Sequence, residues 1–277
     1  MHGERRRPTP HLGALLHERN RYRECPPDFY ALGQRFPSFR QYLRNVDDVK
    51  KTAALPFDDP YAVRELTKTL LAHDFGLEWT MPIDRLCPPL PNRLNYVHWI
   101  EDLLQRAGVD PFDKSADIRG IDIGTGASCI YALLGAKMNE WRFVATEIDG
   151  TSFESARDNV IRNHLEHLIS VQRVATTDLL QEPLRAAPKD QHFYFSMCNP
   201  PFFDDMDEAD TNPDVCCMGA SHEMVFPGGE VSFIGHMIDD SIILQQRVLW
   251  YTSMVGRKSS LRRLLALLRE KKVPRVR

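Results

Sequence analysis

From Ile118 onward, the sequence alternates between short apolar runs and longer segments with helical periodicity. The apolar runs are rich in β-branched and aromatic residues, which predicts strands. Strands that alternate with helices form a mostly parallel, doubly wound sheet with helices on its faces. We therefore predict an α/β, Rossmann-like domain over 109–277. Its strands are expected at 118–123, 142–146, 169–174, 192–197 and 248–255.

The part of the chain before this alternation is predicted to be a separate helical module. Residues 1–16 are expected to be disordered, and 17–108 to form a helical cap on the α/β domain. Helices are expected from Asp28 to Phe36, from Pro60 to His73 and from Asn92 to Gly108. The third helix is predicted to bury the apolar residues Tyr96, Val97, Trp99, Ile100, Leu103 and Leu104.

A glycine turn follows the first strand, in the pattern Asp122-x-Gly124-x-Gly126-x-Ser128. Glycines at this point let the backbone approach a ligand closely and aim the next helix at it. Glu147 ends the second strand, where an acid accepts hydrogen bonds from ribose hydroxyls. These features fit two ligands, a nicotinamide dinucleotide or S-adenosylmethionine. The carboxylate of Asp122 favours the second, because it would repel a pyrophosphate at the helix N-terminus.

A proline turn, Asn199-Pro200-Pro201-Phe202, ends the fourth strand. Neither proline can donate to a strand ladder, so the strand stops and Asn199 is held in an extended conformation. The turn presents one amide and one aromatic ring at the carboxyl end of the sheet, where ligands bind in open α/β folds. This arrangement suits a planar ring with an exocyclic amine, such as adenine. Hydride transfer has no use for it, so the turn favours methyl transfer.

Together, Asp122–Tyr131, Thr146–Asp149, Cys198–Phe203 and Arg93–Trp99 resemble the methyltransferase-like sixteen family. The resemblance runs from about His17 through Pro274. The chain is also similar, more distantly, to bacterial rRNA adenine methyltransferases. The family resemblance implies a class I S-adenosylmethionine-dependent methyltransferase fold with a basic N-terminal RNA-binding module. The implied activity is N6-methylation of adenosine in structured RNA, a small nuclear RNA or an mRNA hairpin. The implied location is the nucleus, with the cytoplasm as a second location.

The resemblance also implies roles for individual residues. Arg93 is expected to bind the carboxylate of the cofactor, and Gly124 and Ser128 its amino-acid end. Glu147 is expected to bind the ribose and Asp178 the adenine. Asn199 is also expected to contact the cofactor. In the reaction, the Asn199 side-chain oxygen and the Pro200 carbonyl would accept the N–H groups of the target amine. Pro201 would complete the rigid turn, and Phe202 would stack on a flipped-out base.

Both ends of the chain are basic, although the whole chain is close to neutral, with a formal charge of −3. The early segment Arg19, Arg21, Tyr22 and Arg23 interleaves cations with an aromatic ring, a pattern typical of contact with an RNA backbone and base. Arg257 and Lys258 begin the basic C-terminal segment. We expect RNA as partner, a monomeric protein, no metal, and no membrane association. The alternative for each charged run is a solvated surface.

Two features depart from the family pattern. The run from Asp204 to Asp214 is acidic where the family is basic and proline-rich, so RNA gripping by this loop is not expected. The chain stops at Arg277, near the start of the expected sixth strand, so the final strands are expected to be missing. The strand at 248–255 would then be an open, apolar edge, and we expect reduced stability.

Two alternative functions remain open from the sequence. Protein glutamine methylation uses a similar Asn-Pro-Pro turn but commonly has tyrosine after it, and Phe202 and the arginine-rich arm count against it. A catalytically silent RNA-binding protein with the same fold is the other alternative.

Overall fold

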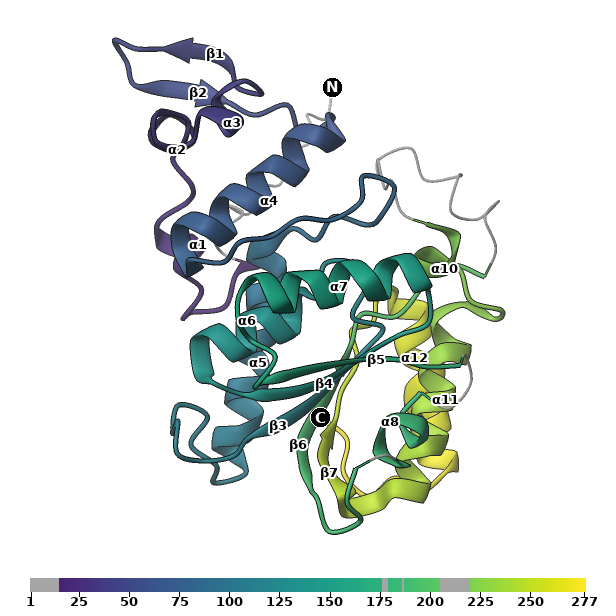
Figure 1. The fold of residues 1–277 in the computed structure, drawn as a ribbon. Helices are drawn as coiled ribbons and strands as arrows, with labels where there is room; N and C mark the ends of the chain where they lie inside the picture. Colours follow the sequence, from purple (N-terminus) through teal and green to yellow (C-terminus); the bar gives the residue numbers. More distant parts are fainter. Residues whose placement is uncertain (1–14, 176–178, 186, 205–219) are drawn as a thin grey trace, which may run out of the picture.

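A five-stranded parallel sheet lies at the centre of the computed structural model, which describes residues 15–175, 179–185, 187–204 and 220–277 (Figure 1). Its strand order is β5-β4-β3-β6-β7, so the chain turns back at the neighbouring strands β3 and β6. Such a switch point is where open α/β sheets bind ligands. The five strands confirm the predicted Rossmann-like fold: β3 (Arg119–Ile123), β4 (Arg142–Glu147), β5 (Ile169–Arg173), β6 (Phe193–Cys198) and β7 (Val248–Tyr251).

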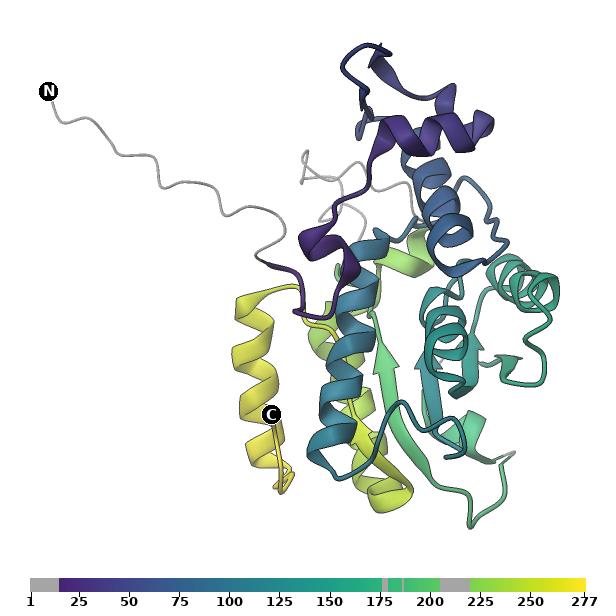
Figure 2. The same ribbon diagram turned by 90° about the vertical axis from the view of Figure 1, so that its left-hand side faces the viewer.

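Helices cover both faces of the sheet (Figures 1 and 2). One core joins the face of Phe143, Ala145 and Phe195 to α5, α6 and α7, and a second core joins the opposite face to α8 and α11. Helix α12 packs on the outside of α11. These helices are α5 (Leu90–Arg106), α6 (Ile130–Asn139), α7 (Gly150–Arg162), α8 (Gln181–Arg185), α10 (Ser221–Met224), α11 (Gly229–Leu244) and α12 (Lys258–Glu270).

A close approach inside the sheet requires a glycine on β3. A Cβ atom built on Gly120 would lie 2.3 Å from the ring of Phe195 on the neighbouring strand. Phe195 in turn packs against Trp141 and Phe143, with ring centroids 5.0 and 5.7 Å away. The missing side chain of Gly120 therefore leaves the space that this aromatic cluster fills.

The N-terminal part of the chain is helical as predicted, with one addition. Asp28 and Asp59 cap α2 and α4 through backbone N–H groups of the first helical turns. The addition is an antiparallel hairpin, β1 and β2, between α3 and α4 (Figure 1). The elements here are α1 (Arg21–Glu24), α2 (Phe29–Arg35), α3 (Pro37–Arg40), β1 (Arg44–Asp47), β2 (Thr52–Ala54) and α4 (Pro60–Phe75).

Two smaller predictions about this part were wrong. Trp99 is 38% exposed, because the buried side of α5 follows Tyr96, Val97, Ile100, Leu103 and Leu104, and the Trp99 ring lies outside against Tyr96. Leu16 is buried in the core although disorder was expected through residue 16. Residues 1–14 lie outside the described part of the chain, and the domain boundary at 108 and 109 stays a prediction.

Strand β7 forms one edge of the sheet that the structure describes. It ends at Tyr251, earlier than predicted, although the backbone N–H groups of Thr252 and Met254 still donate to β6. Leu249 on this edge is 48% exposed, and the Arg277 guanidinium lies over the Trp250 ring at 5.5 Å. No described helix combines the length and the apolar character needed to cross a membrane.

Candidate active site

The glycine turn and the proline turn meet at the switch point of the sheet. Ile123 on β3 is the register partner of Cys198 on β6, so Gly124 and Asn199 follow directly after paired residues. Ile123 is also paired with Thr146 on β4, which places Glu147 one residue beyond. Three strand ends that are far apart in the sequence thus present their next residues side by side.

A cavity of about 370 Å³ opens at these strand ends. This volume lies within the range of small-ligand sites, roughly 300–1,000 Å³. The polar residues that line it include Arg93, Ser128, Tyr131, Glu147, Asn199 and Glu223. Its apolar lining includes Ile148, Val174, Leu179, Phe226 and Phe233. The cavity therefore has the mixed lining expected for a ligand with an apolar ring and a charged end.

The glycine turn needs its glycines for their backbone conformation. Gly124 and Gly126 have φ angles of 64° and 65°, in the left-handed region that glycine adopts readily. A Cβ atom on Gly124 would meet no heavy atom within 4 Å, so the missing side chain leaves open space. Glu147 shapes the turn from the other side: Gly126 donates to its Oε2 at 2.9 Å, and Ile148 and Asp149 donate to its Oε1 at 2.8 and 2.9 Å.

Arg93 enters the cavity from helix α5. It is buried, its Nη1 donates to the Tyr131 hydroxyl at 3.0 Å, and its guanidinium lies 5.6 Å from the centre of that ring. Among the described residues no carboxylate lies within hydrogen-bond distance of Arg93. A buried cation of this kind is suited to bind an anionic group of a ligand.

Asn199 is held at the cavity with its side-chain oxygen unused. Its Oδ1 is buried and has no hydrogen-bond partner in the part of the chain that the structure describes. A buried acceptor without a partner costs about 1–3 kcal/mol, and a donor from a bound ligand or substrate would recover this cost. This atom, together with the open glycine turn, fits the amine acceptor that the sequence predicted.

The rest of the proline turn is fixed by its surroundings. Phe203 donates its N–H to Met224 O and accepts from the N–H of Phe226, which ties the turn to the segment after α10. Phe202 packs against the loop after β7, since a Cβ atom on Gly256 would lie 2.9 Å from its ring. That loop is held by Glu230, which accepts from the N–H groups of Gly256 and Arg257.

The predicted site residues fall into three groups. The cavity lining includes Arg93, Gly124, Ser128, Glu147, Asn199 and Pro201. Pro200 and Phe202 stand next to it in the turn but do not line it. Asp178 and the acidic residues 205–214 lie outside the described part of the chain.

Three residues at the site were not predicted from the sequence: Tyr131, Glu223 and Glu230. Tyr131 stands within a motif that the sequence had already identified, so its place there could have suggested it. Glu230 follows two glycines that predicted only a helix start. Glu223 belongs to a short helix with no motif around it, and no sequence signal marks it.

Comparison with known proteins agrees with this geometry. Residues 11–277 match the model of a family described as RNA methyltransferase. This chain belongs to that RNA methyltransferase family. It is 44% identical over 274 residues to the human RNA N(6)-adenosine-methyltransferase METTL16, covering 96% of this chain and 48% of the relative. It is 40% identical over 277 residues to the U6 small nuclear RNA (adenine-(43)-N(6))-methyltransferase of Caenorhabditis briggsae, covering 91% and 56%. The chain thus spans about half the length of the curated relatives it matches.

Solved structures show the same fold. The human METTL16 catalytic domain in complex with MAT2A 3′UTR hairpin 6 matches with a TM-score of 0.83 and 42% identity, covering 94% of this chain and 90% of that one. The N-terminal domain of human METTL16 in complex with SAH matches with a TM-score of 0.79 and 43% identity, covering 94% and 91%.

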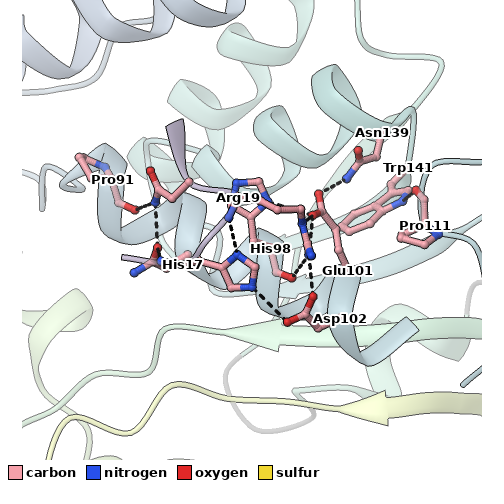
Figure 3. A network of polar contacts seen from close by, with 11 residues as sticks. His17, Arg19, Pro91, His98, Glu101, Asp102, Pro111, Asn139 and Trp141 are labelled. Atoms are coloured by element: carbon pink, nitrogen blue, oxygen red, sulfur yellow. Dashed lines mark hydrogen bonds and ion pairs between the residues drawn. The ribbon is translucent and has the colours of Figure 1, made fainter. Parts of the chain in front are cut away.

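In this member of the RNA methyltransferase family, the basic arm before α1 is committed to contacts within the protein (Figure 3). Arg19 donates to Glu101 Oε2 at 3.1 Å, to Asp102 Oδ1 at 2.7 Å and to the backbone oxygen of His98 at 2.9 Å. His17 Nδ1 accepts from the Arg19 N–H, so its Nε2 carries the proton that it donates to Asp102. The arm is thereby fastened to helix α5.

Burial and hydrogen bonding act against each other at the centre of this network. Burial alone would raise the pKa of Glu101, but hydrogen bonds from His98 and Asn139 and the charge of Arg19 lower it. The carboxylate is therefore held ionised, with its two oxygens shared among three side chains.

The expectation that Tyr22 stacks on a base is wrong in this arrangement. Its ring is 5% exposed, and its hydroxyl donates to Asp74 Oδ2 at 2.6 Å. Burial and this hydrogen bond raise the pKa of the phenol. Arg21 forms an ion pair with the same Asp74, and Arg23 donates to Leu16 O. The aromatic ring of Tyr22 thus anchors the arm.

The predicted RNA-binding cations near the C-terminus differ in this respect, because Arg257 and Lys258 are exposed at the start of α12.

Arg19→Ala is expected to lower the free energy of unfolding by about 1–3 kcal/mol, because Glu101 is 1% exposed and would lose a charged partner. Arg157→Ala is the matched control. Its side chain is 48% exposed and pairs with the exposed Glu154, so its loss should cost less than about 0.5 kcal/mol. Denaturant unfolding measures both. Equal stability of the two variants would contradict the anchoring role of Arg19.

Proposed function

We propose that this chain is an S-adenosylmethionine-dependent RNA adenosine N6-methyltransferase. The observation that carries the proposal is the unpartnered, buried Oδ1 of Asn199 beside a glycine turn at the switch point of the sheet. Its relatives are named as RNA adenosine methyltransferases, and one solved relative holds SAH. The substrate is an unpaired adenosine in a structured RNA, and the place of action is the nucleus, in keeping with a relative named for a small nuclear RNA.

The residues of the cavity fit S-adenosylmethionine, which supplies an electrophilic methyl group when bound. Arg93 would bind its carboxylate, Gly124 and Ser128 its amino-acid end, and Glu147 its ribose. Ile148, Val174 and Leu179 offer an apolar surface for the adenine, and Asp178 adjoins Leu179 in the sequence.

The proline turn acts on the acceptor amine. An aromatic amine is a weak nucleophile because its lone pair is delocalised into the ring. Asn199 Oδ1 and the Pro200 carbonyl accept hydrogen bonds from the two N–H groups of the amine. These bonds favour the pyramidal form of the amine nitrogen, in which its lone pair is free to attack. Pro201 keeps the turn rigid, and Phe202 stacks on the flipped base, a contact worth about 1–3 kcal/mol. Most of the remaining rate gain comes from positioning, and the proton leaves after transfer without a general base.

RNA is held by cations outside the cavity. Arg257 and Lys258 are exposed at the start of α12, next to the loop that packs against Phe202. Phosphate contacts from such residues position the RNA without reading its sequence.

The test is methyl transfer from labelled S-adenosylmethionine to a hairpin RNA with one unpaired adenosine. Digestion of the product should give labelled N6-methyladenosine, and a hairpin with guanosine at that position should stay unlabelled. RNA binding without any transfer would support the silent RNA-binding alternative. Label on protein glutamine would support the other alternative.

A further inference from the structure

The cavity contains a second carboxylate, Glu223, that the proposed mechanism leaves without a role. It belongs to α10 and lines the cavity together with residues of the strand ends. Its Oε2 accepts from the backbone N–H groups of Leu86 and Ala220, both at 2.9 Å. These two donors come from different loops, so the carboxylate is fixed from both sides.

The loop that supplies Leu86 is itself anchored. The neighbouring Arg85 forms an ion pair with Asp149 at 3.2 Å and donates to Ser152 Oγ at 3.1 Å. Both partners lie at the start of α7, directly after the Glu147 strand end. The Glu223 carboxylate therefore has a fixed position relative to the glycine turn rather than the freedom of a surface side chain.

The second oxygen of Glu223 points to the glycine turn. A Cβ atom on Gly126 would lie 3.8 Å from its Oε1. Within the described residues this oxygen has no hydrogen-bond donor, whereas both oxygens of the neighbouring Glu147 accept from backbone N–H groups. The Glu147 carboxylate is thus engaged by backbone N–H groups, whereas Glu223 keeps one oxygen that faces the cavity and can accept a hydrogen bond from a ligand.

We propose that Glu223 binds the α-ammonium group of the cofactor, opposite Arg93, which binds its carboxylate. The inference rests on the proposed function and adds a residue to its site. The amino-acid end of the cofactor is a zwitterion, and burying an ammonium is costly unless a carboxylate pairs with it. Because Glu223 also joins the Leu86 loop to α10, an occupied site would fasten these two segments over the cofactor.

The test uses three ligands that differ only at the amino-acid end. S-adenosylhomocysteine has both charges, its desamino analogue keeps only the carboxylate, and 5′-methylthioadenosine has neither. Glu223→Gln keeps an oxygen for the N–H groups of Leu86 and Ala220 but removes the charge. Calorimetry should give about tenfold weaker binding of S-adenosylhomocysteine to this variant, the loss of one charge-assisted hydrogen bond. Affinities for the other two ligands should stay within about twofold.

Glu154→Gln is the matched control, since Glu154 is an exposed glutamate on α7 and its change should leave all three affinities as in the wild type. Unchanged binding of S-adenosylhomocysteine by Glu223→Gln would overturn the inference. Equal weakening of all three ligands would also overturn it, because Glu223 would then only fasten the loops or contact the ribose. If the wild-type protein binds none of the three, the proposed function itself fails.

Discussion

Replacing Asn199 by alanine is expected to lower the rate of methyl transfer about 10²–10³-fold without lowering the melting temperature. The rate falls because the variant lacks the acceptor that binds the amine while its electron density changes during transfer. Removing a single preorganised hydrogen-bonding group from an enzyme active site typically lowers the rate by this factor. The stability is expected to be unchanged or higher, because Oδ1 is buried without a partner and its removal relieves about 1–3 kcal/mol of desolvation.

Single-turnover kinetics at saturating cofactor and RNA measure the chemical step of this variant apart from binding. Asn159→Ala is the control, and we expect it to change stability rather than the rate of transfer. Asn159 is fully buried, its Oδ1 accepts from the Thr80 N–H at 3.0 Å, and its Nδ2 donates to Thr80 O at 2.7 Å. Its loss should lower the melting temperature and affect transfer far less. A wild-type rate for Asn199→Ala would remove the proline turn from the mechanism.

The sheet could be predicted because its signals are local. Each strand is a short segment that contains β-branched or aromatic residues, and the glycine and proline turns mark where two of the strands end. The neighbourhood of those two turns could also be predicted, since the carboxyl ends of parallel strands lie at one edge. The actual pairing of Ile123 with Cys198 needed the strand order, which local patterns do not contain.

The residues that reach the site from elsewhere could not be predicted in the same way. Glu223 is placed by a hydrogen bond from the backbone N–H of Leu86, which is far away in the sequence, and no periodicity marks such a contact. The composition of the basic arm shows its charges but not the partners that they have within the protein. Glu101, Asp102 and Asp74 lie on helices where they read as ordinary surface acids, and only the packing brings them to Arg19 and Tyr22.

The second large effect concerns Asp122, the buried acid of strand β3. It is 1% exposed, its Oδ2 accepts from the Thr125 hydroxyl at 2.7 Å, and its Oδ1 has no partner among the described residues. Burial, opposed by the Thr125 hydrogen bond and assisted by the charge of Glu147, raises the pKa of this carboxyl from 3.8 to about 7. Between these two pKa values the folded protein therefore carries a proton here that the unfolded chain has released.

The sign of the pH dependence follows from this difference. Between about pH 4 and 7 the folded state binds more protons at this group than the unfolded state, so its contribution to stability falls as the pH rises. Above the folded pKa the loss is complete, at about 4 kcal/mol. Asp122→Asn removes the titration, so its free energy of unfolding should gain on the wild type by about this amount from pH 4 to pH 8.

Thr125→Val sharpens the test because it alters the pKa without removing the acid. The hydroxyl lowers the pKa of Asp122, so its loss should raise that pKa further. The stability of this variant should then continue to fall above pH 7, where the wild-type contribution has levelled off. Denaturant unfolding from pH 4 to pH 9 compares the free energies of unfolding of the three proteins. The comparison uses the slope of this free energy against pH and not its absolute value, because an asparagine at 122 adds the cost of an unpaired amide equally at every pH. Parallel curves for wild type and Asp122→Asn would mean that Asp122 is ionised in the folded protein throughout this range.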